Sequence, residues 1–179
     1  MSKYKSKLAL EVEQYQDILL NGEMLAVDPS SGSSGSLPGY ALFRKGQLVD
    51  AGTIELPRGT RPLSNRLYLL RNALATSFDK PDLLTIELIS PVMPSKGGTF
   101  LHKNASSLIK SVGSILSTWY VPVLEVSPMT WQSMTPPQYK KDDVQDACMI
   151  GWAVFITLAR LTGTEEPKVT LPNTTQGSL

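Results

Sequence analysis

The chain has 179 residues, a 41% share of apolar residues and a formal net charge of +1. This length suits a single domain with a core of its own, and this composition excludes a disordered chain. A single cysteine, Cys148, excludes an internal disulfide and a zinc site built from cysteines. The longest nearly uncharged apolar run, residues 147–159, is shorter than the roughly 18 to 20 residues of a membrane span, and no signal-peptide pattern follows the N-terminal lysines. We therefore expect a cytoplasmic protein with no membrane segment.

Residues 1–22 predict a helical extension at the N-terminus. Apolar side chains recur at helical spacing over residues 8–20, and Asn21-Gly22 is a suitable helix end. Three short strands are predicted next, at residues 24–27, 40–43 and 48–56. A loop rich in serine and glycine separates the first two strands, and a Lys-Gly turn separates the last two. This pattern predicts a three-stranded antiparallel meander.

Helices and strands alternate along the rest of the chain. The predicted elements are a helix at 63–78, a strand at 83–89, a helix at 104–119, a strand at 121–126 and a helix at 142–161. Their order predicts an α/β domain over residues 23–161, with a mixed five-stranded sheet flanked by helices. Residues 162–179 are polar and rich in threonine and proline, so we expect a flexible C-terminal tail.

Acidic residues stand in apolar surroundings at three places in this scheme. Asp28 ends the first strand, Glu87 lies within the fourth, and Asp143 and Asp146 open the last helix, where a spacing of three residues puts them on one face. Several carboxylates near one another repel strongly, and a hard cation held by oxygen ligands is the usual remedy. Two magnesium ions on such a cluster can promote the hydrolysis of a phosphodiester.

Taken singly, most of these residues have a simpler explanation. The aspartates at the start of the last helix could serve the helix dipole, and Asp28 could be a turn residue before Pro29. Glu87 is harder to explain, because a charged residue among aliphatic neighbours in mid-strand is uncommon. The four together, in this order along the chain, favour a metal-dependent active site.

Short sequence blocks around these carboxylates resemble those of RuvC Holliday-junction resolvases, which have an RNase H-like fold. The blocks are Val27-Asp28-Pro29, Gly39-Tyr40, Thr85-Ile86-Glu87 and Asp143-Val-Gln-Asp146-Ala147. The resemblance extends over residues 25–161 and matches the predicted order β-β-β-α-β-α-β-α. It implies that Asp28, Glu87, Asp143 and Asp146 are catalytic residues that bind Mg²⁺ or Mn²⁺, two ions per active site. The implied activity is that of a crossover junction endodeoxyribonuclease acting in DNA recombination or repair.

The stretch from Phe100 to Ala105, Phe-Leu-His-Lys-Asn-Ala, resembles the segment that opens the second helix in that family. There the aromatic residue wedges into the base stack of the junction, and the following helix forms the homodimer interface. The resemblance therefore implies a homodimer that cuts four-way or other branched DNA by paired nicks. The candidate DNA-contacting residues are Phe100, Lys103, Asn104, Lys140 and Lys141.

Some positions depart from the family pattern. Ser30 replaces the usual glycine, the loops after Asp28 and Glu87 are longer, and Trp131 stands in a segment where the family has a lysine. A diverged member, of viral or phage origin, would fit these departures. Other functions stay open: an RNase H-fold nuclease on flaps or RNA–DNA hybrids, a non-catalytic DNA-binding or scaffolding protein, and an ATP-binding member of the superfamily. The four intact carboxylates argue against the second, and the lack of a second phosphate loop argues against the third.

Overall fold

The computed structural model describes residues 6–29, 37–56, 63–88 and 99–172, and of residues 99–107 it describes the backbone alone. The strands of this part are β1 (Glu23–Asp28), β2 (Gly39–Arg44), β3 (Gln47–Thr53), β4 (Leu83–Glu87) and β5 (Val123–Val126). The helices are α1 (Lys7–Gln14), α2 (Gln16–Asn21), α3 (Leu63–Ser77), α4 (Thr99–Leu116), α5 (Pro128–Gln132) and α6 (Asp143–Thr162).

The five strands form one mixed sheet in the order β3-β2-β1-β4-β5. Strands β1, β2 and β3 pair antiparallel, and the turn between β2 and β3 is closed by Lys45 and Gly46, both with positive φ. Strand β4 pairs parallel with β1 and with β5. Parallel neighbours need a crossover between them, and α3 and α4 supply it. The predicted α/β class and the mixed five-stranded sheet are therefore confirmed.

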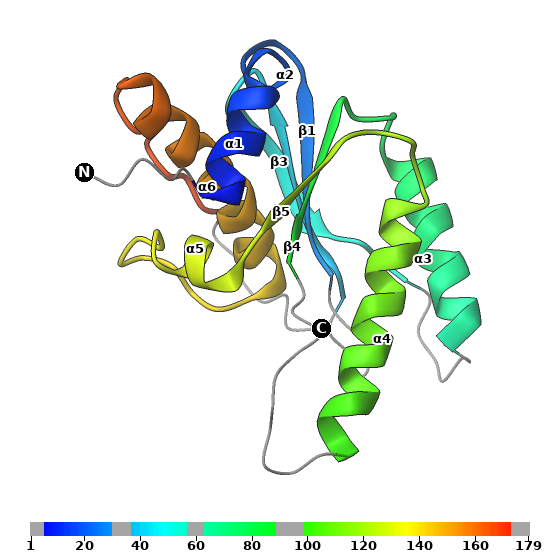
Figure 1. Ribbon diagram of the computed structural model, residues 1–179. Coiled ribbons are helices and arrows are strands. Elements are labelled where there is room, and N and C mark those ends of the chain that lie inside the picture. Colours follow the sequence, from blue (N-terminus) through cyan, green and yellow to red (C-terminus); the bar gives the residue numbers. More distant parts are fainter. Residues whose placement is uncertain (1–5, 30–36, 57–62, 89–98, 173–179) are drawn as a thin grey trace.

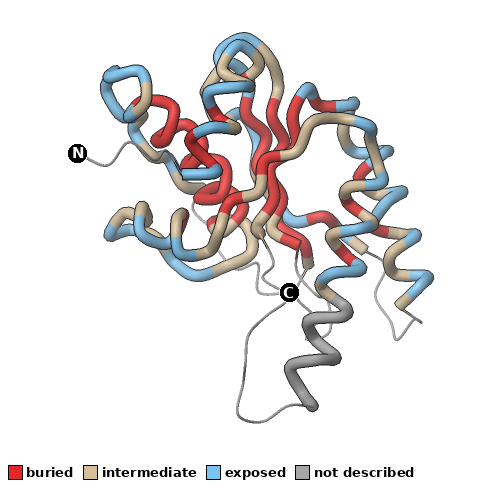
Figure 2. The backbone as a smooth tube through the Cα atoms, viewed as in Figure 1, coloured by how far each residue is buried: buried red, intermediate tan, exposed pale blue. Residues whose placement is uncertain are grey.

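Helices cover both faces of the sheet (Figure 1). On one face α6 crosses β1 and β2 and carries α1 beside it, while α3 and α4 pack together on the other face. The strands alternate accordingly: Met24 and Ala26 join the core with α6, whereas Leu25 and Val27 join the core with α3 and α4. Figure 2 shows that buried residues follow the central strands and most of α6. Since both sides of β1 and β4 are covered, these strands read as continuous apolar runs.

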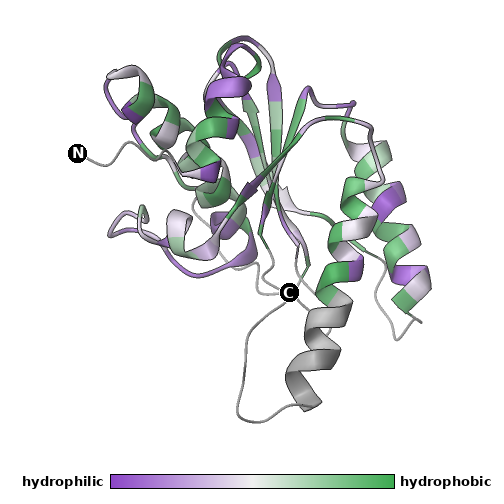
Figure 3. Ribbon diagram, in the orientation of Figure 1, coloured by the Kyte–Doolittle hydropathy of each residue, from purple (hydrophilic) through white to green (hydrophobic). Residues whose placement is uncertain are grey.

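Helix α6 is the centre of the larger core cluster. Its residues from Ala147 to Ala159 are all buried, and Figure 3 shows its apolar colour beside the sheet. Gly151 permits close contact with β2, because a side chain there would lie 2.2 Å from the ring of Phe43. By length and composition α6 could also cross a membrane, but 72% of its apolar 18-residue stretch is buried inside the domain, as in the core helix of a globular fold. The left-handed Gly163 ends the helix.

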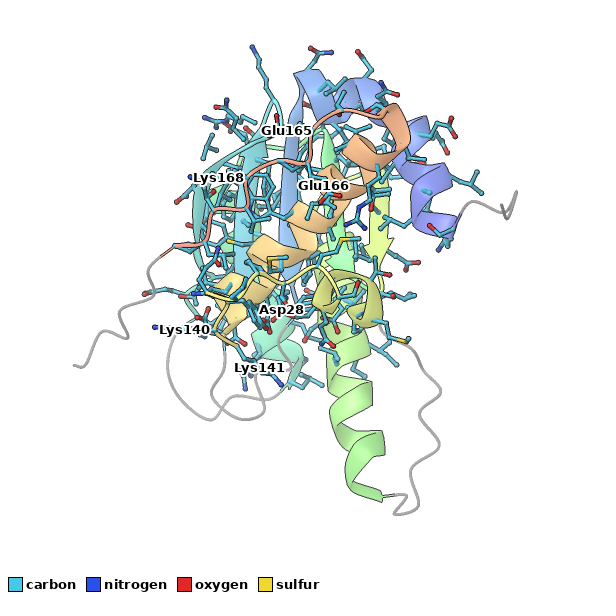
Figure 4. All side chains as sticks on the ribbon, turned by 90° about the vertical axis from the view of Figure 1, so that its left-hand side faces the viewer. Asp28, Lys140, Lys141, Glu165, Glu166 and Lys168 are labelled. Atoms are coloured by element: carbon cyan, nitrogen blue, oxygen red, sulfur yellow. The ribbon has the colours of Figure 1, made fainter. Side chains whose placement is uncertain are left out.

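The chain turns back along α6 after Gly163. The indole N–H of Trp152 donates to the Thr170 carbonyl at 2.9 Å, and the Gln145 amide donates to the Pro172 carbonyl at 3.4 Å. Figure 4 shows this return past Glu165, Glu166 and Lys168. The described part of the expected tail is thus held against the domain, and the flexibility predicted for residues 162–179 stays a prediction.

The N-terminal residues belong to the same core. Leu8, Ala9 and Val12 of α1 are buried, and α1 packs against α6 and β5. The continuous helix predicted over residues 8–20 is divided at Tyr15 into α1 and α2.

Several predicted boundaries were wrong. Strand β3 ends at Thr53 and not at Leu56, and α4 ends at Leu116 and not at Trp119. Helix α4 begins at Thr99 and not at Asn104, because residues 99–103 contain no proline or glycine that would keep the helix from starting directly after Gly98. Strand β5 begins at Val123 and not at Val121, since Pro122 has no N–H for the ladder.

Candidate active site

Asp28 and Glu87 lie at the same edge of the sheet, at the carboxyl ends of β1 and β4. The parallel pairing runs from Met24–Leu83 to Val27–Ile86, so the two acidic residues come next on their strands. Asp28 continues the alternation of Met24 and Ala26 along β1, and Glu87 continues that of Leu83 along β4; these apolar residues pack with α6. Both carboxylates are therefore on the face that α6 covers.

The first turn of α6 is brought to this edge by direct backbone contact with β2. Gly39 pairs with Asp28 across the β1–β2 ladder, and a Cβ on Gly39 would lie 1.7 Å from the carbonyl oxygen of Asp143. Because glycine has no side chain, the backbone of the first turn of α6 can lie directly against the backbone of β2. The backbone N–H of Leu37 donates to the Asp143 carboxylate, and Asp142 caps the helix by accepting from the Gln145 N–H at 2.8 Å.

The electrostatics of Asp28 show that the other three carboxylates lie near enough to act on it. Burial, together with the charges of Glu87, Asp146 and Asp143, raises the pKa of Asp28 from 3.8 to about 8. Burial also raises the pKa of Glu87, Asp143 and Asp146. Figure 4 shows Asp28 beside the start of α6, with Lys140 and Lys141 at the same end of the molecule. Perturbed carboxylates grouped in this way are typical of functional sites.

Two aromatic side chains contact these carboxylates, and the sequence analysis did not predict either contact. The Trp131 indole N–H donates to Glu87 Oε2 at 3.1 Å, and the Tyr139 hydroxyl donates to Asp146 Oδ1. The two rings meet edge to face, with centroids 6.2 Å apart. These hydrogen bonds and the positive charge of Lys141 oppose the effect of burial on the pKa of Glu87 and Asp146. No sequence pattern could have revealed the contacts, because they join residues of α5 and its following loop to β4 and α6.

The carboxylates suit a hard divalent cation by their donor chemistry. Carboxylate oxygens are the ligands that Mg²⁺ and Mn²⁺ prefer, and a cation would offset the burial and the neighbouring negative charges that raise the pKa of Asp28. Among the residues that the structure describes, no three acidic, histidine or cysteine side chains converge into a ready-made metal site. The donor chemistry therefore suits a divalent metal, while the carboxylates of the described residues are not gathered around one point.

Comparisons with known proteins give evidence at the level of fold. No protein-family model matches the chain, and no curated protein matches it by sequence. Two solved structures of Thermus thermophilus RuvC do match. One is in complex with a Holliday junction substrate and has a TM-score of 0.57 and 14% identity, covering 82% of this chain and 99% of that chain. The other has a TM-score of 0.54 with the same identity and coverage. The fold is RuvC-like.

Of the expected DNA-contacting residues, the structure places two, Lys140 and Lys141, at the active-site end of this RuvC-like fold. Lys140 and Lys141 are exposed in the loop before α6, and Lys141 is near enough to influence Glu87 and Asp146. The backbones of Phe100, Lys103 and Asn104 belong to the first turns of α4, but their side chains lie outside the described residues. Ser30 also lies outside them.

Helix α4, the expected dimer interface, also contributes to the core. Ser111 and Ile115 are buried, and the Ser114 hydroxyl donates to the Leu67 carbonyl of α3 at 2.7 Å. Val112 and Leu116 pack against the same core cluster. Ile109 is 48% exposed, so among residues 108–116 it is the large apolar residue that is exposed enough to contact a partner. Homodimer formation stays a prediction.

Proposed function

We propose that this protein is a divalent-metal-dependent endonuclease that cuts four-way and other branched DNA by paired nicks. The observation that carries the proposal is the site around Asp28. Carboxylates from β1, β4 and α6 lie at one edge of a RuvC-like sheet, and Asp28 is buried there within reach of the negative charges of the other three. Burying a carboxylate near three others is unfavourable for the fold, and a site for divalent metals is a reason to keep it.

Asp28, Glu87, Asp143 and Asp146 are the residues that would hold Mg²⁺ or Mn²⁺, two ions in each site. When bound, the ions supply charge that activates the attacking water and stabilises the leaving oxygen of the phosphodiester. The products expected from the resemblance are a 5′-phosphate and a 3′-hydroxyl.

The remaining contribution of the chain is to place the DNA. Lys140 and Lys141 stand exposed at the active-site end, where they would attract the phosphate backbone. Contacts of this kind read the position of the backbone and not the base sequence, so we expect recognition by DNA shape. Paired nicks in a symmetric junction need two active sites related by a two-fold axis, which a homodimer would supply.

The decisive experiment compares labelled four-way, three-way, flap, linear and RNA–DNA hybrid substrates, with Mg²⁺ or with EDTA. We expect metal-dependent cleavage of branched DNA above all. Asp146→Asn should reduce the rate by orders of magnitude and leave junction binding unchanged or tighter, because a negative charge facing phosphate is removed. Asp142→Asn is the matched control, since asparagine also caps a helix and Asp142 lies outside the proposed ligand set.

Each alternative predicts a different pattern in the same assay. Preferred cleavage of hybrids or flaps would favour another RNase H-fold nuclease. Junction binding by the wild type without cleavage in either metal would favour a non-catalytic DNA-binding protein. Full cleavage by Asp146→Asn would rule out the assigned site.

A further inference from the structure

The first residue of interest beyond the four carboxylates is Trp131. Only 2% of its surface is exposed, and its indole N–H donates to Glu87 Oε2 at 3.1 Å. Its position is fixed by α5, which begins directly after β5: the Ser127 hydroxyl accepts from the Thr130 N–H, and Pro128 occupies the first turn. The ring belongs to the core cluster under α6. Since the backbone and the ring are both held, the donor points at Glu87 from a rigid support.

The second residue is Tyr139, in the loop that leads from α5 to α6. Its hydroxyl donates to Asp146 Oδ1, and its ring packs edge to face against Trp131. The backbone on both sides is tied down, because the Tyr139 N–H donates to the Pro136 carbonyl at 3.0 Å and the Lys140 N–H donates to the Gln145 side chain at 2.7 Å. The two aromatic residues therefore form one supported unit that contacts two carboxylates from different elements.

We propose that Trp131 and Tyr139 are positioning residues that orient Glu87 and Asp146 for metal binding. This inference rests on the proposed function, in which these carboxylates are metal ligands. Each hydrogen bond engages one carboxylate oxygen and leaves the second oxygen as a ligand for a cation. Both donors are neutral, so they fix the carboxylates without a positive charge that would compete with the metal. Outer partners of this kind set the orientation of metal ligands, and their loss typically weakens metal affinity about 10- to 100-fold.

The test measures metal binding directly, with the full chain and without DNA. Mn²⁺ is titrated calorimetrically into the wild type, Tyr139→Phe, Trp131→Phe and the double variant. Tyr139→Phe removes a hydroxyl and keeps the ring, so it separates the hydrogen bond from the packing. Tyr120→Phe makes the same chemical change on a tyrosine that is 99% exposed and outside the site, and it is the matched control. Thermal unfolding of every variant is recorded in EDTA.

We expect Tyr139→Phe to bind Mn²⁺ about 10- to 100-fold more weakly, with an unchanged melting temperature in EDTA. Cleavage by this variant should need correspondingly more Mn²⁺ for half-maximal rate and should approach the wild-type rate at saturation. Trp131→Phe should show the same shift, and the double variant should lose less than the product of the two single effects, because the rings are in contact. Tyr120→Phe should match the wild type.

Three results would overturn the inference, and they are distinguishable. A wild type that neither binds Mn²⁺ nor cleaves DNA would overturn the proposed function and this inference with it. A wild type that binds and cleaves, beside a Tyr139→Phe variant with unchanged Mn²⁺ affinity, would overturn the positioning role alone. A loss of rate that is equal at every Mn²⁺ concentration, with a lowered melting temperature, would mean that the two residues only support the fold.

Discussion

Gly39→Ala is the most direct test of how the site is assembled. The added Cβ would lie 1.7 Å from the carbonyl oxygen of Asp143 and 2.4 Å from its carbonyl carbon. Non-bonded atoms of this kind settle at about 3.5 Å, so one backbone must retreat by about 1.5 Å or more. The obstructing atoms belong to the main chain and cannot rotate away as a side chain could. Further along α6, the contact of Gly151 with Phe43 holds the helix in place, so the displacement should fall on its first turn.

The expected cost follows from these distances. Overpacking of a tight contact destabilises a protein by about 1–3 kcal/mol, and in a chain of this size each kcal/mol lowers the melting temperature by about 2–4 °C. The catalytic effect should be larger, because a displacement of about 1 Å at a reacting group can reduce a rate about 100-fold. Asp143 and Asp146 both move with the first turn of α6, so we expect a loss of at least this size.

The assay is single-turnover cleavage of a four-way junction well below the melting temperature of the variant, beside thermal unfolding. Gly113→Ala is the control for stability, since Gly113 is exposed in α4 and a Cβ there meets nothing within 4 Å. That change should leave stability unchanged or raise it by about 0.5–1 kcal/mol. Wild-type cleavage and stability in Gly39→Ala would refute the contact between Gly39 and the first turn of α6.

Three further predictions concern charge, DNA and assembly. In EDTA the wild type should lose stability as the pH rises from about 4 to about 8, because the folded state keeps the Asp28 proton that the unfolded state releases near pH 3.9. In denaturant unfolding, Asp28→Asn should therefore be more stable than the wild type by about 1–3 kcal/mol at pH 8 but not at pH 4. Phe100→Ala should slow junction cleavage strongly and leave the melting temperature nearly unchanged, whereas a large drop would identify a core residue. Sedimentation should show a homodimer at micromolar concentration, and Ile109→Glu should dissociate it; a wild-type monomer would contradict the interface through α4.

The strands and their order along the chain could be predicted from the sequence because the apolar runs are long and well bounded. Strands β1 and β4 are covered on both faces, so Met24 to Val27 are all apolar, Thr85 is the one polar residue from Leu83 to Ile86, and the boundaries of both runs are clear. The acidic residues at the ends of these runs were conspicuous for the same reason. Once Asp28 and Glu87 end adjacent parallel strands, topology alone brings them to one edge of the sheet.

The contacts that complete the site could not be predicted, because they depend on packing between distant segments. Nothing near Trp131 or Tyr139 in the sequence indicates that their donors face Glu87 and Asp146. The role of Gly39 depends on how closely α6 approaches β2, which periodicity does not specify. The start of α4 was also predicted too late, since helix propensity around Thr99 is modest and gives no boundary.

The return of the chain along α6 has a practical consequence for anyone who handles the protein. The Pro172 carbonyl accepts a hydrogen bond from the Gln145 amide in the first turn of α6, one residue before Asp146. An affinity tag or fused module attached directly after Pro172 would therefore be tethered beside the edge that would receive DNA. A basic tag at this position would add its own attraction for phosphate to every binding measurement, and it should be removed before affinities are compared. The same tether would bring a fused DNA-reading domain to the substrate at high effective concentration, which offers a route to direct cutting toward a chosen sequence.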